Sequence, residues 1–191
     1  MIQDNRNISR SIHLPLQSGS NRILGLMNRH YTLSDYMSII ERARGLLDSS
    51  SISTDLIVGF PGEEEDDFEQ TLKAIQTIRY DDAFTYAYSP RSGTPAGSMR
   101  ECLTREEKIA RLQRLIEVQR EISSQKLVER INREEEVIVE KFSKKSSQRV
   151  MGRTFLNHVA IIPGTDDDIG KKVKIRVIGV HGSTLRGARL A

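Results

Sequence analysis

The sequence contains one cysteine and no long apolar segment. Because Cys102 is the only cysteine among the 191 residues, the chain cannot form an intramolecular disulfide or a metal site made only of its own cysteines. No apolar run approaches the roughly 18 to 20 residues of a membrane-spanning helix, and the polar N-terminus does not resemble a signal peptide. These absences predict a cytoplasmic protein that does not enter a membrane.

Charge is distributed unevenly along the chain, whose formal net charge is +3. Residues 1–133 hold 18 Lys and Arg against 19 Asp and Glu, a net −1, whereas residues 134–191 hold 11 against 7, a net +4. All of the basic excess therefore lies in the last third. Such asymmetry indicates a region that binds a polyanion, although a solvated lysine-rich surface would give the same count.

Residues 53–68 predict a strand, a tight turn and an acid-rich helix start. The apolar run from Ile52 to Val58 is typical of a strand buried on both faces. Gly59 and Gly62 permit the turn, and the five acids at 63–67 suit the positive end of a helix dipole. The turn lacks the lysine and hydroxyl of a phosphate-binding loop, so the acids favour a cationic or amino-bearing ligand. A purely structural role would explain the same pattern.

Two further segments follow the same plan. Ser11–Leu16 and Ala83–Tyr88 read as strands that end in polar, glycine- and proline-rich turns, and helical patterns separate the three strands. Repeated strand–helix units predict an α/β fold with a parallel sheet and right-handed crossovers. Ligands bind such sheets at the carboxyl ends of the strands. We therefore expect one shared rim, formed by the turns at 17–18, 59–63 and 89–91.

A long helix is predicted to begin at Thr104, where Glu107 completes a capping box, and to end near Ile131. Lys108, Arg111 and Arg114 form a basic stripe along it, which is more typical of a solvated face than of a binding surface.

From Glu134 onward, apolar residues alternate with polar ones, as in Val173–Val177, which predicts several short strands. Short strands at such close spacing predict a small β-barrel. Phe142 and Phe155 are its only aromatic residues. Base stacking should thus be minor beside phosphate contact. The residues expected to give the barrel a positive face are Arg149, Arg153, Lys171, Lys172, Lys174 and Arg176.

Four motifs resemble, in order and spacing, those of the radical S-adenosylmethionine (SAM) methylthiotransferases; they lie at His13–Ser20, Met27–Thr32, Thr54–Glu63 and Tyr88–Pro95. Ser92 replaces a usual proline. Leu14–Ser20 and Met151–Thr154 are most similar to MiaB-type tRNA enzymes, and fit the branch that acts on a ribosomal protein less well. The resemblance implies a partial TIM-like radical SAM barrel with three parallel strands over residues 1–133 and an OB-like TRAM domain over 134–191.

For the intact enzyme, the resemblance implies transfer of a methylthio group to a prenylated adenosine beside the tRNA anticodon, with SAM and two 4Fe–4S clusters. One SAM methylates a cluster-bound sulfur and a second is cleaved to a radical. The cluster-binding cysteines of the family are absent from this chain, so we expect a C-terminal part that is inactive alone and works with tRNA and the N-terminal part. An RNA-binding module, or a metabolic TIM-like enzyme with an appended barrel, are the alternatives.

The resemblance also implies site residues. Those expected to hold SAM are Gln17, Ser18, Asp55, Phe60 and Arg29. Arg29 and Arg91 suit a cofactor carboxylate or an RNA phosphate, because a guanidinium binds either bidentately. The RNA-binding set comprises Arg91, Arg149, Arg153, Lys172, Lys174 and Arg176. We predict no catalytic side chain or metal ligand, and the four histidines are interpreted as structural.

Overall fold

The structure is a computed structural model, and it describes residues 5, 7–47, 49–143 and 146–190. The chain divides into two compact units. We call residues 12–48 and 52–122 the α/β unit, and residues 1–11, 49–51 and 123–191 the barrel unit. Among the described residues, no helix is long and apolar enough to cross a membrane.

The sheet has three parallel strands, as predicted: β1 (Ser11–His13), β2 (Ser51–Val58) and β3 (Asp82–Ala87), in the order β1-β2-β3. β2 and β3 pair with Asp55 beside Phe84. Beyond β1 the chain stays alongside β2, because the Gln17 N–H donates to the Asp55 carbonyl and the Gln17 carbonyl accepts from the Ile57 N–H. The first loop is thus anchored to the centre of the sheet.

Helices connect the strands: α1 (Asn21–Leu26), α2 (Leu33–Leu46), α3 (Glu65–Ile78), the 3-10 turn η1 (Pro95–Ser98) and α4 (Arg105–Val128). α4 has the predicted capping box, in which Thr104 Oγ1 accepts from the Glu107 N–H at 3.2 Å and Glu107 accepts from the Thr104 N–H at 2.7 Å. These bonds satisfy N–H groups that have no partner within the helix. α4 ends at Val128, three residues before the predicted end, because a turn follows in which the Ile131 N–H donates to the Val128 carbonyl.

Alternate residues of β2 build the core of the α/β unit. Ile52, Leu56 and Val58 are at most 1% exposed and share one cluster with α2, α3 and α4, including Phe68 and Leu115. Full burial of such side chains stabilises the fold by about 1.5–3 kcal/mol each. The intervening residues of β2 remain partly exposed. The prediction of a strand buried on both faces is therefore wrong for this chain, because helices cover one face only.

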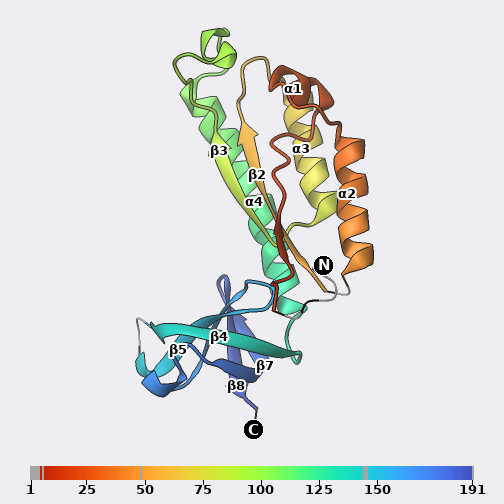
Figure 1. Cartoon of the computed structure of the whole chain (residues 1–191). Helices are drawn as coiled ribbons and strands as arrows, with labels where there is room; N and C mark the ends of the chain where they lie inside the picture. The colour runs from red at the N-terminus through yellow and green to blue at the C-terminus, as the bar shows by residue number, and fades with distance from the viewer. Residues whose placement is uncertain (1–4, 6, 48, 144–145, 191) are drawn as a thin grey trace. The chain divides into compact units, whose positions relative to one another are not determined.

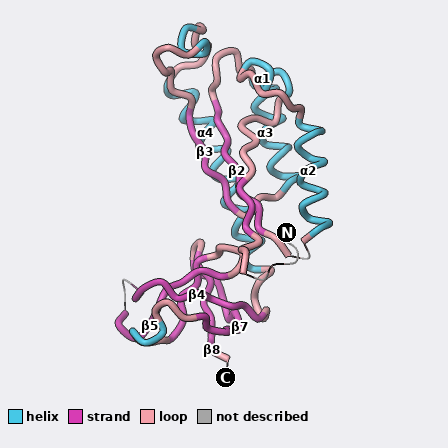
Figure 2. The backbone as a smooth tube through the Cα atoms, in the orientation of Figure 1, coloured by secondary structure: helices cyan, strands magenta, loops and turns pink. Residues whose placement is uncertain are grey.

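The barrel unit forms the small β-barrel that was predicted, and the structure shows it to be closed and five-stranded, with the strand order β4-β5-β6-β8-β7. Figure 2 draws its strands in magenta. Alternate residues of the first and fourth strands point into the barrel and are at most 1% exposed, namely Val137, Val139, Ile175 and Val177. Closure leaves no unpaired sheet edge. The strands are β4 (Glu134–Ser143), β5 (Ser146–Thr154), β6 (Val159–Pro163), β7 (Lys172–His181) and β8 (Thr184–Arg189), with the 3-10 turn η2 (Asp166–Asp168) before β7.

Candidate functional site

The loops after the three strands leave the same end of the parallel sheet, where α1 also lies (Figure 1). Two glycines let the first two loops pack closely. A Cβ on Gly19 would lie 2.6 Å from the Gln70 carbonyl oxygen of α3, and one on Gly59 would lie 2.5 Å from Lys108 Cγ of α4. Gly59 also has φ +72°, which strains other residues. These contacts hold the loops against the helices.

Gln17 occupies a strained position in the first loop. Its φ is 72°, a value that is uncommon for a residue other than glycine, and it is 7% exposed. The two backbone bonds to β2 hold it in this conformation, and such strain clusters at functional sites. The first of these bonds places Gln17 beside the Asp55 backbone, and the role of both residues in binding SAM stays a prediction.

Ser18 is enclosed within the same loop. It is 0% exposed, its Oγ lies 3.4 Å from Thr71 Oγ1, and it accepts from the Ser20 N–H at 3.2 Å. Thr71 also accepts from the Gly19 N–H at 2.9 Å. The Ser18 hydroxyl therefore fastens the loop to α3, and its predicted contact with a cofactor stays a prediction.

Asp55 lies on the uncovered face of the sheet beside His13. Asp55 Oδ2 is 3.4 Å from His13 Nε2, while His13 Nδ1 is 3.0 Å from Ser53 Oγ. The His13 ring also makes an edge contact with Phe84, at 5.8 Å between centroids. β1, β2 and β3 thus each contribute a side chain to one polar and aromatic cluster. The interpretation of His13 as structural stays a prediction.

Phe84 and Tyr86 continue this uncovered face along β3. They are 51% and 52% exposed and lie beside Asp55 and Ile57 of β2. Parallel sheets are normally covered on both faces, so these large exposed aromatic residues leave an apolar surface available to another group. The period-two aromatic pattern of 84–88 was the signal in the sequence that could have identified it.

Phe60 links the second loop to the third. It is 6% exposed, and its ring lies edge-on to Tyr88 at 5.1 Å between centroids. Lys108 Nζ lies 5.4 Å from the Tyr88 centroid and pairs with Glu101 at 2.6 Å. The Tyr88 hydroxyl is buried without a hydrogen-bond partner among the described residues. An aromatic pair therefore forms this part of the rim.

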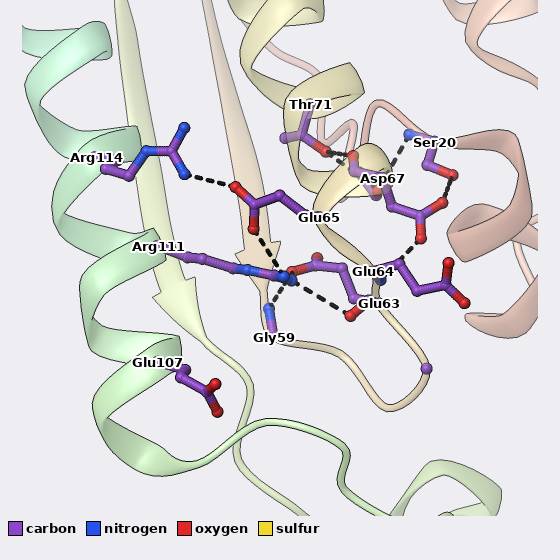
Figure 3. A network of polar contacts seen from close by, with 12 residues as sticks. Ser20, Gly59, Glu63, Glu64, Glu65, Asp67, Thr71, Glu107, Arg111 and Arg114 are labelled. Carbon is purple, nitrogen blue, oxygen red and sulfur yellow. Dashed lines mark hydrogen bonds and ion pairs between the residues drawn. The ribbon is translucent and has the colours of Figure 1, made fainter.

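Two acids of the run, Glu63 and Glu65, pair with arginines of the basic stripe on α4 (Figure 3). Glu63 Oε1 accepts from the Gly59 N–H at 2.8 Å and from Arg111 Nη1 at 2.7 Å. Arg111 Nη2 donates to Glu65 at 2.9 Å, and Arg114 Nη1 donates to the other Glu65 oxygen at 2.7 Å. Burial raises the pKa of Glu63, although the bonds from Gly59 and Arg111 oppose the shift.

These contacts overturn two interpretations of the sequence. The acids were expected to favour a cationic ligand, but Glu63 is 3% exposed and its cationic partner is Arg111. The basic stripe was read as a solvated face, but Lys108 and Arg111 are both buried. The charged side chains form ion pairs with residues far away in the sequence. Periodicity along one helix does not reveal such pairs.

Asp67 ties α3 to the first loop. Its Oδ1 accepts from Ser20 Oγ at 2.6 Å, and its Oδ2 accepts from the Glu64 N–H at 2.9 Å and from Arg22. Burial alone would raise the pKa of Asp67, but the hydrogen bonds from Arg22, Ser20 and Glu64 outweigh it and lower the pKa. The first and second loops are therefore held together by an ionised carboxylate.

Arg29 and Arg91 are exposed. Arg29 follows α1, where its N–H donates to the Leu24 carbonyl, and Arg91 belongs to the loop after β3. No ion pair involves either guanidinium within the described part of the chain. Both are free to bind an anion, but no described contact joins them to Gln17 or Asp55.

The predicted cations of the barrel differ in their partners. Arg176 donates to Glu134 at 2.6 Å, and Arg153 lies 3.5 Å from Glu140 and bonds Asn157. Lys174 of β7 is in register with Glu136 of β4, so acids alternate with the cations. The positive face is therefore less uniform than predicted. Over the ranges that the structure describes, no ion pair is found for the exposed residues Arg149, Lys172 and Lys174.

Two family models match separate parts of the chain. Residues 2–75 match the Radical SAM superfamily, and residues 129–190 match the TRAM domain. These two stretches of the chain are thus similar to a radical SAM domain and to a TRAM domain. A solved structure, that of Escherichia coli coproporphyrinogen III oxidase (HemN), described as a radical SAM enzyme, resembles part of this chain. The match covers 59% of this chain and 27% of the HemN chain, with a TM-score of 0.51 and 20% sequence identity. This likeness concerns the fold alone.

Curated relatives extend the similarity over both domains. The tRNA-2-methylthio-N(6)-dimethylallyladenosine synthases of Natranaerobius thermophilus and Carboxydothermus hydrogenoformans are each 41% identical to this chain, over 97% and 93% of its length. That of Clostridium botulinum strain Okra is 41% identical over 96%. The chain spans about two fifths of the length of these relatives, namely 40% to 41%.

The radical SAM segment suits only some of the groups that its superfamily implies. Gln17, Asp55 and Phe60 offer an amide, a carboxylate and an aromatic edge, which match the hydroxyl, amino and adenine groups of SAM. An iron–sulfur cluster requires about four thiolates, and the chain has one exposed cysteine, Cys102. Its described residues contain no group of three or more metal-ligating side chains. One cysteine is too few for a cluster, and the assignment of SAM to Gln17, Asp55 and Phe60 stays a prediction.

Proposed function

We propose that this chain is part of a tRNA methylthiotransferase that modifies a prenylated adenosine beside the anticodon. The observation that carries the proposal is 41% identity to tRNA-2-methylthio-N(6)-dimethylallyladenosine synthases over 97% of the chain. The cluster-binding cysteines would come from the remainder of the same enzyme, and the reaction would take place in the cytoplasm.

In this proposal the rim holds SAM. Gln17 and Asp55 orient its hydroxyl and amino groups, Phe60 contacts adenine, Arg29 pairs with its carboxylate, and Ser18 keeps the first loop in place. When bound, SAM supplies the methyl group and the radical of the reaction. His13 holds the Asp55 carboxylate in position, while Phe84 and Tyr86 shield the uncovered face from water, since a dry site strengthens electrostatic contacts.

The barrel unit holds the RNA. Lys172, Lys174 and Arg149 have no ion-pair partner among the described residues and contact phosphates directly. Arg153 and Arg176 must exchange an acidic partner for a phosphate, so each contributes less. Arg91 reaches RNA from the loop after β3. No side chain of this chain is assigned a step in the bond chemistry.

The test of the rim is calorimetric titration of the chain with SAM. We expect binding that weakens about tenfold in Asp55→Ala and in Gln17→Ala, since loss of one hydrogen bond to a charged group is worth about 1.5–3 kcal/mol. Glu41→Gln, an exposed carboxyl of α2, is the matched control and should bind as the unaltered chain does. Equal affinity in all four proteins would contradict the assignment of the rim.

A second function is that of an RNA-binding module that delivers tRNA to a separate catalytic region. The closed barrel, with its own apolar core, favours it. Binding of tRNA by the chain without any binding of SAM at millimolar concentration would support this second function over the first.

A further inference from the structure

A pocket on the barrel unit combines an aromatic wall with unpaired polar groups. Its volume is about 230 Å³, and it is lined by Asn7, Ser9, Glu136, Ile138, Thr154, Phe155 and Lys172. This is below the roughly 300–1,000 Å³ of sites for drug-sized ligands. It suits a single planar ring system rather than a whole cofactor such as SAM.

The loop that carries Phe155 is fixed before any ligand arrives. Ser9 Oγ donates to the Phe155 carbonyl at 2.7 Å, the Thr154 N–H donates to the His158 carbonyl at 2.9 Å, and the His158 N–H donates to Thr154 Oγ1 at 3.1 Å. Phe155 is itself only half-buried. A ligand that stacks on it therefore loses little free energy to ordering of the loop.

The remaining polar side chains of the pocket are available to a ligand. Ser9 and Thr154 already bond the loop, whereas the side chains of Asn7, Glu136 and Lys172 have no partner among the residues that the structure describes. Lys172 and Glu136 lie on the neighbouring strands β7 and β4. The pocket thus offers a cation for a phosphate, a carboxylate for N–H donors and an aromatic face.

We propose that this pocket binds one unpaired nucleotide of RNA, with guanine as its preferred base. Phe155 and Ile138 enclose the base, because unpaired RNA bases stack on aromatic side chains and are read on their Watson–Crick edges. The two oxygens of Glu136 match the adjacent N1–H and N2–H donors of guanine, which adenine lacks. Lys172 contacts the phosphate. This inference rests on the proposed RNA-binding function and adds one stacking site to the phosphate contacts expected from the sequence.

The test measures affinity of the full chain for fluorescein-labelled nonamers of uridine that carry guanosine, adenosine or an abasic nucleotide at the centre. Phe155→Leu keeps the pocket apolar but removes the aromatic face, and Phe155→Tyr retains it. Phe142→Leu, at the exposed aromatic residue of β4, is the matched control. Circular dichroism of each variant checks that the barrel remains folded.

We expect the guanosine nonamer to bind most tightly and to lose about tenfold affinity in Phe155→Leu, as stacking of one base predicts. Phe155→Tyr and Phe142→Leu should each change affinity less than twofold. Glu136→Gln should remove the preference for guanosine over adenosine while the abasic nonamer binds as before. The dependence on salt should stay unchanged in Phe155→Leu, since stacking releases no counterions.

Equal affinity of Phe155→Leu and the unaltered chain for the guanosine nonamer would overturn the pocket assignment. If Lys174→Ala, which lies outside the pocket lining, still weakened binding in that case, the RNA-binding function would stand without the pocket. Absence of RNA binding by the unaltered chain would overturn both.

Discussion

The two units use charged side chains in opposite ways. In the α/β unit, Glu63 and Asp67 are buried and bonded to Arg111 and Arg22, so these charges hold loops and helices together. On the barrel unit, Lys172 and Lys174 are exposed and no described residue pairs with them. Both sets appear as charge runs in the sequence. The comparison shows that a charge indicates binding only where the fold leaves it without an internal partner.

The largest effect should come from breaking the buried pair of α4. Arg111→Ala leaves the Glu63 carboxylate buried without its partner, which destabilises a protein by about 3–5 kcal/mol. Urea denaturation measures the loss. Arg120→Ala, on the exposed side of the same helix, should cost below about 0.5 kcal/mol. A similar loss of unfolding free energy in the two variants would show that the Arg111–Glu63 pair does not stabilise this region.

A smaller, pH-dependent effect should follow from Asp67→Asn. The folded chain lowers the pKa of Asp67 below its ordinary value of 3.8, so the ionised group stabilises the fold at neutral pH and this contribution is lost as the pH falls through the lowered pKa. We expect a loss of about 2 kcal/mol at pH 7 that shrinks below about pH 4. Denaturation at a series of pH values checks it. Asp66→Asn, at the exposed neighbour, is the control and should change the free energy of unfolding at pH 7 by less than about 0.5 kcal/mol.

The smallest effect on stability should come from the barrel. Lys172→Ala and Lys174→Ala should each change the free energy of unfolding by less than about 0.5 kcal/mol, since exposed side chains without partners contribute little. Urea denaturation again measures it. A loss above 2 kcal/mol in either variant would place these lysines among the structural charges and remove the contrast between the units.

Elements with local signals were predictable from the sequence. The parallel strands, the capping box of α4 and the small barrel follow from periodicity and turn residues that lie within a few positions of each other. The partners of Glu63 and Asp67 could not be predicted from the sequence, because Arg111 and Arg22 lie 48 and 45 residues away in the chain. The same holds for the cluster of His13, Asp55 and Phe84, which forms only once three strands are aligned in register.

The most direct test of the account is the slope of log affinity for tRNA against log salt concentration, for the unaltered chain and for Lys172→Ala/Lys174→Ala. Each lost phosphate contact reduces the slope by about one. We predict a slope shallower by about two in the double variant, with weaker binding at low salt. An unchanged slope would contradict the assignment of these unpaired lysines to RNA.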